Sequence, residues 1–112
     1  MRFGWSRVGW LVESFNGALF MGGGPEDVIE STVCNKAEMA GWLVRKVSWP
    51  GRRGAMDHVF AKDGRIVWIE FKQRGKEPDV LQRNEMKRWK AAGAEVYWIS
   101  GVNDGLLLLG LA

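Results

Sequence analysis

Two acidic residues and one lysine in the middle of the chain have spacing that suits catalysis. The dipeptide Asp63-Gly64 stands between two runs of strand-forming residues and is a strong signal for a two-residue β-hairpin turn. With that turn, Lys62 pairs with Arg65, and counting outward along both strands sets Asp57 directly opposite Glu70. Their Cβ atoms are then expected roughly 4.5 to 5.5 Å apart.

Like charges in opposed positions repel, so this pair requires either screening by solvent or a bound cation. The two strands are apolar on both faces, as in a sheet covered on both sides, which argues against solvent. Adjacent carboxylates suit a hard ion such as Mg²⁺, and without it at least one of their pKa values should be raised. Lys72 lies two residues beyond Glu70 on the same face, where it could hold an attacking water or stabilise charge on phosphoryl oxygens.

Further polar residues could reach this place. Glu30 lies on the apolar side of a predicted helix, so it is expected to face the sheet, whereas Glu26 is explained more simply as an acid favoured at a helix N-terminus. Gln82 opens the apolar stripe of a second predicted helix, where it either caps the core or contacts the site. His58 is interpreted as structural, because alternation along the strand turns it away from Asp57.

Basic side chains are concentrated around these acids. From residue 45 to residue 90 there are thirteen Lys and Arg against six acids, a local charge of +7, whereas the rest of the chain carries −4. A basic middle indicates a polyanion-binding surface, with an ordinary solvated face as the alternative. The candidates for phosphate contacts are Arg52, Arg53, Arg74, Lys76, Arg83, Lys87 and Lys90.

Length and composition indicate one small globular domain with a modest core, since 46% of the 112 residues are hydrophobic. The single cysteine, Cys34, is interpreted as structural and excludes an internal disulfide or a cysteine-based zinc cluster. No apolar run approaches the roughly 20 residues of a membrane span, and the N-terminus lacks a signal-peptide pattern. A cytoplasmic location without a membrane partner is therefore expected. Seven tryptophans indicate an aromatic core or, alternatively, an aromatic oligomer interface.

Local patterns predict the elements that position these residues. Residues 1–21 indicate a β-hairpin around Asn16-Gly17, followed by a glycine-rich joint. Helices are predicted from about Glu26 to Ala40 and from the N-cap Asp79 to Ala92. Strands are predicted at residues 42–49, 57–61, 66–72 and 95–100, and residues 106–111 could be strand or helix. The order, a hairpin followed by αβββαβ, predicts an α/β fold with a mixed sheet flanked by helices, divided into an extension (1–24) and a main domain (25–112).

The ordered motifs resemble those of VRR-NUC domains in the PD-(D/E)xK nuclease superfamily. Asp57 followed by Glu70-Phe71-Lys72 is similar to the D…(D/E)xK signature, and the αβββαβ order is similar to the restriction-endonuclease-like core. Within this family, the chain more closely resembles the small stand-alone domains found in phages and bacteria. The residues that carry this resemblance are 26–30, 50–57, 82 and 92–96. Met56 departs from the pattern, because it stands where that family usually has proline.

The resemblance implies Mg²⁺- or Mn²⁺-dependent hydrolysis of DNA phosphodiesters. It implies Asp57, Glu70 and Glu30 as metal ligands, Lys72 as catalytic partner and Gln82 as a supporting catalytic residue. It also implies a homodimer that acts on branched DNA such as Holliday junctions, in a bacterial or phage-infected cell. One alternative is a nucleic-acid-binding module of the same fold without turnover, and another is an interaction domain whose hairpin and tryptophans mediate assembly.

Overall fold

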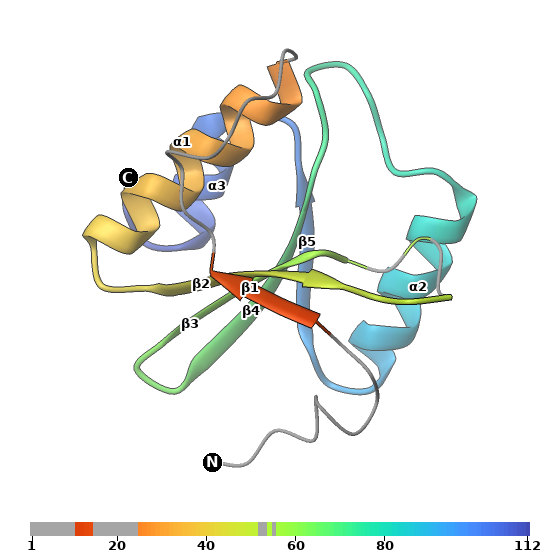
Figure 1. Ribbon diagram of the computed structural model, residues 1–112. Helices are drawn as coiled ribbons and strands as arrows, with labels where there is room; N and C mark the ends of the chain where they lie inside the picture. Colours follow the sequence, from red (N-terminus) through yellow and green to blue (C-terminus); the bar gives the residue numbers. More distant parts are fainter. Residues whose placement is uncertain (1–10, 15–24, 52–53, 55) are drawn as a thin grey trace.

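A computed structural model describes residues 11–14, 25–51, 54 and 56–112, which form a mixed sheet between two layers of helices (Figure 1). The strands are β1 Leu11–Ser14, β2 Leu43–Ser48, β3 His58–Lys62, β4 Arg65–Phe71 and β5 Glu95–Ile99, and they lie side by side in that order. Neighbouring strands are antiparallel except β4 and β5, which are parallel. Helices α1 Pro25–Met39 and α3 Val102–Leu108 cover one face, and α2 Val80–Ala91 covers the other (Figure 1).

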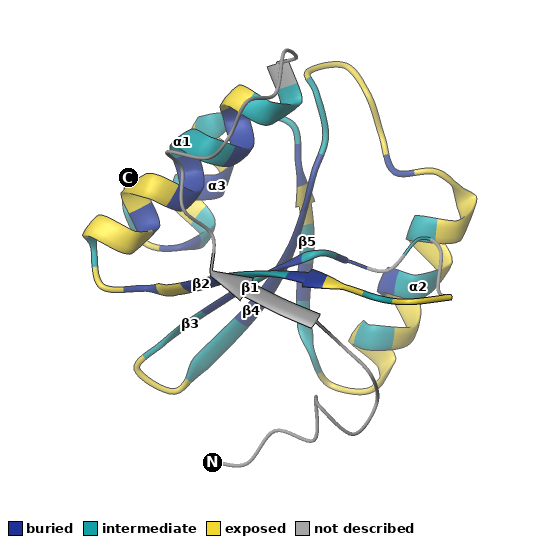
Figure 2. Ribbon diagram, in the orientation of Figure 1, coloured by how far each residue is buried: buried dark blue, intermediate teal, exposed yellow. Residues whose placement is uncertain are grey.

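Each face of the sheet buries its own apolar cluster. Figure 2 shows the buried residues along the strands and on the helices that cover them. The cluster under α1 and α3 includes Val33, Val44, Phe60, Val67, Ile69, Phe71 and Ile99. The cluster under α2 consists of Val47, Met56, Trp68, Met86 and Val96. Successive residues of β4 enter opposite clusters because strand side chains alternate. This confirms the prediction that the sheet is covered on both sides.

The β3–β4 hairpin has the predicted register. The ladder runs from the pair Lys62–Arg65 to the pair His58–Ile69. Asp63 at φ 50° and Gly64 at φ 82° both adopt the left-handed backbone that a two-residue type I′ turn requires. The ladder ends one residue short of Asp57, which therefore lies just before β3.

The two longer helices agree with the predictions to within one residue at each end, as do the strands β2 to β5. Helix α2 begins with a capping box: the Asp79 side chain accepts a hydrogen bond from the Gln82 N–H at 2.9 Å, and Gln82 Oε1 accepts one from the Asp79 N–H at 3.0 Å. Gly93, at φ 98°, follows the end of this helix. Within the described part of the chain, no helix combines the length and apolar character needed to cross a bilayer.

Two regions differ from the sequence predictions. The segment predicted as either strand or helix overlaps the helix α3, which begins earlier, at Val102, and ends at Leu108. Val102, Gly105 and Leu109 follow the helical spacing i, i+3, i+7 and pack on the α1 side. At the other end, the sequence predicts Leu11–Ser14 as part of an appended hairpin, and this strand pairs with β2 as the edge of the main sheet, which the sequence did not predict. The Asn16-Gly17 turn and the second arm of that hairpin lie outside the described residues.

Replacing Gly105 with alanine is expected to destabilise the fold. Gly105 is buried in α3, and a Cβ there would lie 2.7 Å from Ile99 Cδ1 and 2.9 Å from Val33 Cγ2. We expect the free energy of unfolding to fall by about 1–3 kcal/mol, because a packed core must shift to admit the methyl group. Urea unfolding followed by circular dichroism measures the change. Gly101→Ala, at the N-cap of the same helix with no described atom within 4 Å, is the control, and an equal loss in both variants would contradict this explanation.

Candidate active site

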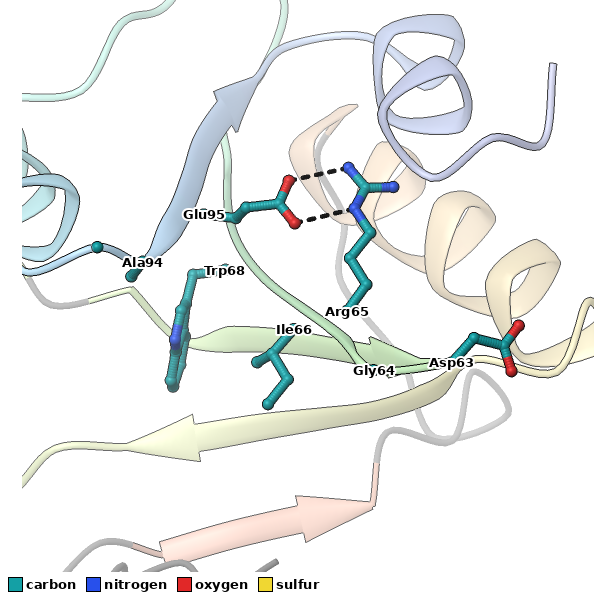
Figure 3. Close-up of a pocket in the computed structure, with 8 residues that line it drawn as sticks. Asp63, Gly64, Arg65, Ile66, Trp68, Ala94 and Glu95 are labelled. Carbon is teal, nitrogen blue, oxygen red and sulfur yellow. Dashed lines mark hydrogen bonds and ion pairs between the residues drawn. The ribbon is translucent and has the colours of Figure 1, made fainter.

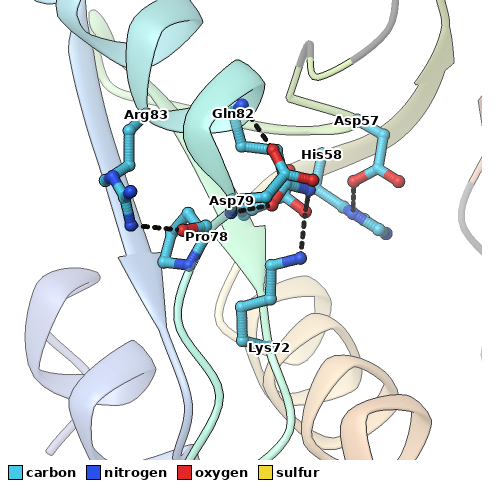
Figure 4. Close-up of polar contacts among 8 residues, drawn as sticks. Asp57, His58, Lys72, Pro78, Asp79, Gln82 and Arg83 are labelled. Carbon is cyan, nitrogen blue, oxygen red and sulfur yellow. Dashed lines mark hydrogen bonds and ion pairs between the residues drawn. The ribbon is translucent and has the colours of Figure 1, made fainter.

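Polar side chains from β4 and α2 meet where β4 ends (Figure 4). Gln82 Nε2 donates a hydrogen bond to Glu70 Oε2 at 3.1 Å, and Lys72 Nζ lies 4.0 Å from the same oxygen. Of the two roles that its sequence position allows, Gln82 has the contact with the site, and it also closes the capping box of α2, which the sequence analysis did not predict. The capped start of α2 thus positions one carboxylate of the predicted pair.

The loop that carries Asp57 into β3 is anchored at several points. Asp57 O accepts a hydrogen bond from Val47 N–H at 2.7 Å, which holds the residue against β2. The Met56 side chain is buried in the α2 cluster. Gly54, at φ 82°, approaches the first turn of α2 so closely that a Cβ would lie 2.8 Å from the Leu81 carbonyl carbon. Glycine is required there for both reasons, and the contact holds the loop beside the site.

Glu70 has a strongly perturbed carboxyl group. Its side chain is 10% exposed, and its pKa is raised to about 8, first by burial and then by the negative charge of Asp57, while Lys72 lowers it. Among the neighbouring charges, that of Asp57 has the largest effect on this pKa. A carboxylate with a raised pKa gains from a nearby cation. The shift agrees with the prediction of a raised pKa for at least one member of the pair.

Glu30 faces the sheet, as predicted from its side of α1. The residue is 5% exposed, its Oε1 lies 3.5 Å from His58 Nε2, and its Oε2 has no hydrogen-bond partner among the described residues. Burial raises the pKa of Glu30, and attraction to His58 and Lys46 opposes that shift. Glu26 is half-buried in the first turn of α1, and its charge also raises the pKa of Glu70. The charges of both glutamates therefore raise the pKa of Glu70, but of the two only Glu30 is buried.

The prediction that His58 points away from Asp57 is wrong. The ring does lie on the α1 side of the sheet, fully buried and edge-on to Phe71, with ring centroids 5.1 Å apart. Its Nδ1 nevertheless lies 2.8 Å from Asp57 Oδ1 (Figure 4), because Asp57 precedes the strand and alternation does not set its side chain. Burial alone would raise the pKa of Asp57, but this hydrogen bond and attraction to His58 and Lys46 lower it below its usual value.

The acids fit a divalent cation without forming a complete cage. Among the residues that the structure describes, no three His, Cys, Asp or Glu side chains form a ready metal-binding group. Mg²⁺ needs only one or two protein carboxylates, because it retains waters and binds substrate phosphate. The raised pKa of Glu70 and the buried, unpartnered Oε2 of Glu30 are features of acids whose charge the protein itself leaves unbalanced. An ion of the Mg²⁺ or Mn²⁺ type fits this chemistry.

The basic residues predicted to contact phosphate differ in their surroundings. Those that are exposed are Arg74, Lys76, Arg83, Lys87 and Lys90. Arg83 is partly occupied, because its Nη1 donates to the carbonyl of Pro78 at 2.8 Å (Figure 4). Arg52 and Arg53 lie outside the described residues, although their neighbour Gly54 is held beside α2.

A surface depression of about 460 Å³ lies at the other end of β4, around the β3–β4 turn and the start of β5 (Figure 3). Of its charged residues Asp63, Arg65 and Glu95, the last two neutralise each other through two hydrogen bonds of 2.9 and 3.0 Å. Tyr97 adds a further hydrogen bond to Glu95. The depression includes none of the acids of the candidate site, and the charges of this ion pair are balanced.

The chain is similar to a phage protein and to a solved structure. A phage protein described as "Putative nuclease p44", from Acyrthosiphon pisum secondary endosymbiont phage 1, is 35% identical over 72 residues, which cover 63% of this chain and 77% of that protein. A solved structure described as a VRR_NUC domain matches with a TM-score of 0.72 and 29% identity, covering 79% of this chain and 97% of that one. No family model matches the sequence.

The fold and these similarities together define a nuclease. The chain belongs to the VRR-NUC family, which confirms the resemblance seen in the sequence motifs. The α/β architecture with a mixed sheet, predicted from the order of elements, is the architecture of this family.

Glu70→Gln is expected to remove a pH dependence of stability from the protein in EDTA. The pKa of Glu70 is about 8 in the folded protein, whereas that of an unfolded glutamate is about 4.3. Between these values the unfolded chain releases a proton that the folded protein retains. The wild-type protein therefore loses stability as pH rises through this window, by at most about 1.4 kcal/mol per pH unit, and the contribution is constant below and above it.

Urea unfolding at about pH 5 and about pH 8 tests this expectation, because the variant should become progressively more stable relative to wild type across that interval. Glu77→Gln, the same substitution at an exposed position, is the matched control. A difference between Glu70→Gln and wild type that does not change with pH would contradict the raised pKa.

Proposed function

We propose that this protein is a Mg²⁺- or Mn²⁺-dependent endonuclease that hydrolyses DNA phosphodiester bonds. The observation that carries the proposal is the grouping of Glu70, Lys72 and Asp57 at one end of a hairpin in a VRR-NUC fold. Asp57 and Glu70, with Glu30 beside them, are the residues that would hold the cation. When bound, such an ion neutralises charge on the phosphoryl group and activates water for attack.

The chain's own side chains have distinct parts in this proposal. Lys72 is 18% exposed, and its ammonium group would stabilise negative charge on a phosphoryl oxygen or hold the attacking water. Gln82 orients the Glu70 carboxylate through its hydrogen bond to Oε2, and the capping box of α2 holds Gln82 in place. Groups held in this way keep their geometry when substrate arrives.

The basic surface supports a nucleic acid as the substrate. Contacts of exposed Lys and Arg with phosphate supply affinity without reading sequence. The candidates among the exposed basic residues that follow the site along the chain are Arg74, Lys76, Arg83, Lys87 and Lys90. The similarity to a phage protein named as a nuclease agrees with this choice. The family resemblance further supports a homodimer that selects branched DNA.

Asp57→Asn and Lys72→Ala are each expected to lower the cleavage rate by at least about 100-fold, because Asp57 would help to hold the cation and the Lys72 ammonium would stabilise negative charge on the phosphoryl group. The substrates are a supercoiled plasmid and a synthetic four-way junction, each incubated with Mg²⁺, Mn²⁺ or EDTA. Wild-type cleavage is expected with either ion and not with EDTA. Faster cutting of the junction than of its linear arms would support selection of branched DNA.

Two matched controls test whether the losses are local. Asp63→Asn makes the same change in the β3–β4 turn, where asparagine tolerates the backbone at φ 50°. Lys36→Ala removes an exposed ammonium from the last turn of α1. Cleavage in EDTA would contradict dependence on a cation. Slower migration of DNA in a gel in the presence of the protein, without cutting in any ion, would indicate that the protein is a DNA-binding module and not an enzyme.

Lys87→Ala and Lys90→Ala are expected to weaken DNA binding and lower its salt dependence. Removing one phosphate contact should reduce the slope of log affinity against log salt concentration by about 0.9, because fewer counterions are released. Fluorescence anisotropy in EDTA at several NaCl concentrations measures this slope, and Lys36→Ala again serves as control. Slopes equal to wild type in both helix α2 variants would exclude phosphate contacts from this surface.

A further inference from the structure

His58 lies between two acids that come from different parts of the chain. Its Nδ1 lies 2.8 Å from Asp57 Oδ1, and its Nε2 lies 3.5 Å from Glu30 Oε1. Asp57 belongs to the loop that enters β3, whereas Glu30 belongs to α1. The His58 side chain therefore links the sheet to helix α1, beside the acids of the candidate site.

Packing alone does not account for a histidine at this position. The ring is fully buried against Phe71 in an otherwise apolar cluster, where an aliphatic side chain would fill the space without burying polar nitrogens. Histidine is the side chain that carries a nitrogen on each side of a rigid ring, so it can face one carboxylate in each direction. The Nδ1 contact at 2.8 Å is a hydrogen bond that offsets the cost of burying that nitrogen, whereas the 3.5 Å between Nε2 and Glu30 Oε1 is an ion-pair distance without hydrogen-bond geometry.

Each acid uses one oxygen toward His58 and retains another. Asp57 keeps Oδ2 on a side chain that is 42% exposed, and Glu30 keeps the buried Oε2 that has no partner among the described residues. Both acids also act on Glu70, since the charges of Asp57 and Glu30 are among the causes that raise its pKa. The second oxygens therefore belong to the same electrostatic environment as Glu70.

We propose that His58 is a positioning residue that holds Asp57 and Glu30 in a set relation, so that the second oxygen of each carboxylate is presented to a divalent cation. The proposal deepens the function proposed above and rests on it for the identity of the site. Partners that orient metal-binding carboxylates typically contribute about 10- to 100-fold to metal affinity. His58 acts through the two acids and does not itself bind the cation or the DNA.

Three substitutions separate the two contacts from packing. His58→Asn places a side-chain amide near the position of Nδ1 and can retain the contact with Asp57. His58→Gln reaches toward the position of Nε2 and can retain the contact with Glu30. His58→Leu keeps an apolar side chain and retains neither contact. Tyr97→Phe, which removes a hydrogen bond to Glu95 outside the site, is the control.

Isothermal titration calorimetry with Mn²⁺, in the absence of DNA, measures the effect. We expect His58→Leu to bind Mn²⁺ about 10- to 100-fold more weakly than wild type, the Asn and Gln variants to lie between them, and Tyr97→Phe to be unchanged. A wild-type affinity in His58→Leu would overturn the proposal, as would a wild-type protein that binds no Mn²⁺. Mn²⁺ binding without DNA cleavage would remove the proposed nuclease function and leave the positioning role standing.

NMR titration of Asp57 in EDTA supplies a second readout that needs no cation. The pKa of Asp57 is lowered chiefly by its hydrogen bond with His58, against the opposing effect of burial. It should therefore rise in His58→Gln and His58→Leu and remain low in His58→Asn. This comparison of Asn with Gln applies even if His58→Leu does not fold, and equal Asp57 titration in both would overturn the proposal.

Discussion

The register of the β3–β4 hairpin is the constraint on which the site depends. A two-residue turn at Asp63-Gly64 sets the pairing, and with it the face of the sheet on which every later side chain lies. A shift by one residue would send Glu70 into the α1 cluster and bring Phe71 toward α2. The apolar residues on both faces make such a shift costly, so the core that stabilises the sheet also keeps Glu70 beside Gln82.

The same arrangement places acidic groups where they are unfavourable for folding. Glu70 and Glu30 are nearly buried, and burial raises the pKa of both. Asp57 differs, because a partner on the neighbouring residue stabilises its charged form. An acid that is costly to ionise gains most from a cation, so the local loss of stability and the proposed activity have one physical origin.

Both helical layers contribute to the candidate site, because the acids lie where β3 begins and β4 ends. From one side, α2 supplies Gln82 through a capping box that sets the start of the helix. From the other side, α1 supplies Glu30, which meets His58 under the helix. The sheet between them brings together groups that are separated in the chain: Gln82 donates a hydrogen bond to Glu70, and Glu30 lies 3.5 Å from His58.

The sequence alone determined what depends on local chemistry: the glycine turn and its register, the capped helices, the strands with two apolar faces, and the candidate residues Asp57, Glu70 and Lys72. Only the tertiary structure decided contacts between distant segments. It paired Leu11–Ser14 with β2, because an edge strand can accept any suitable partner, and it brought Gln82 to Glu70 and His58 to Glu30. Local periodicity describes which way a side chain points within its own element, but not what the next layer places against it.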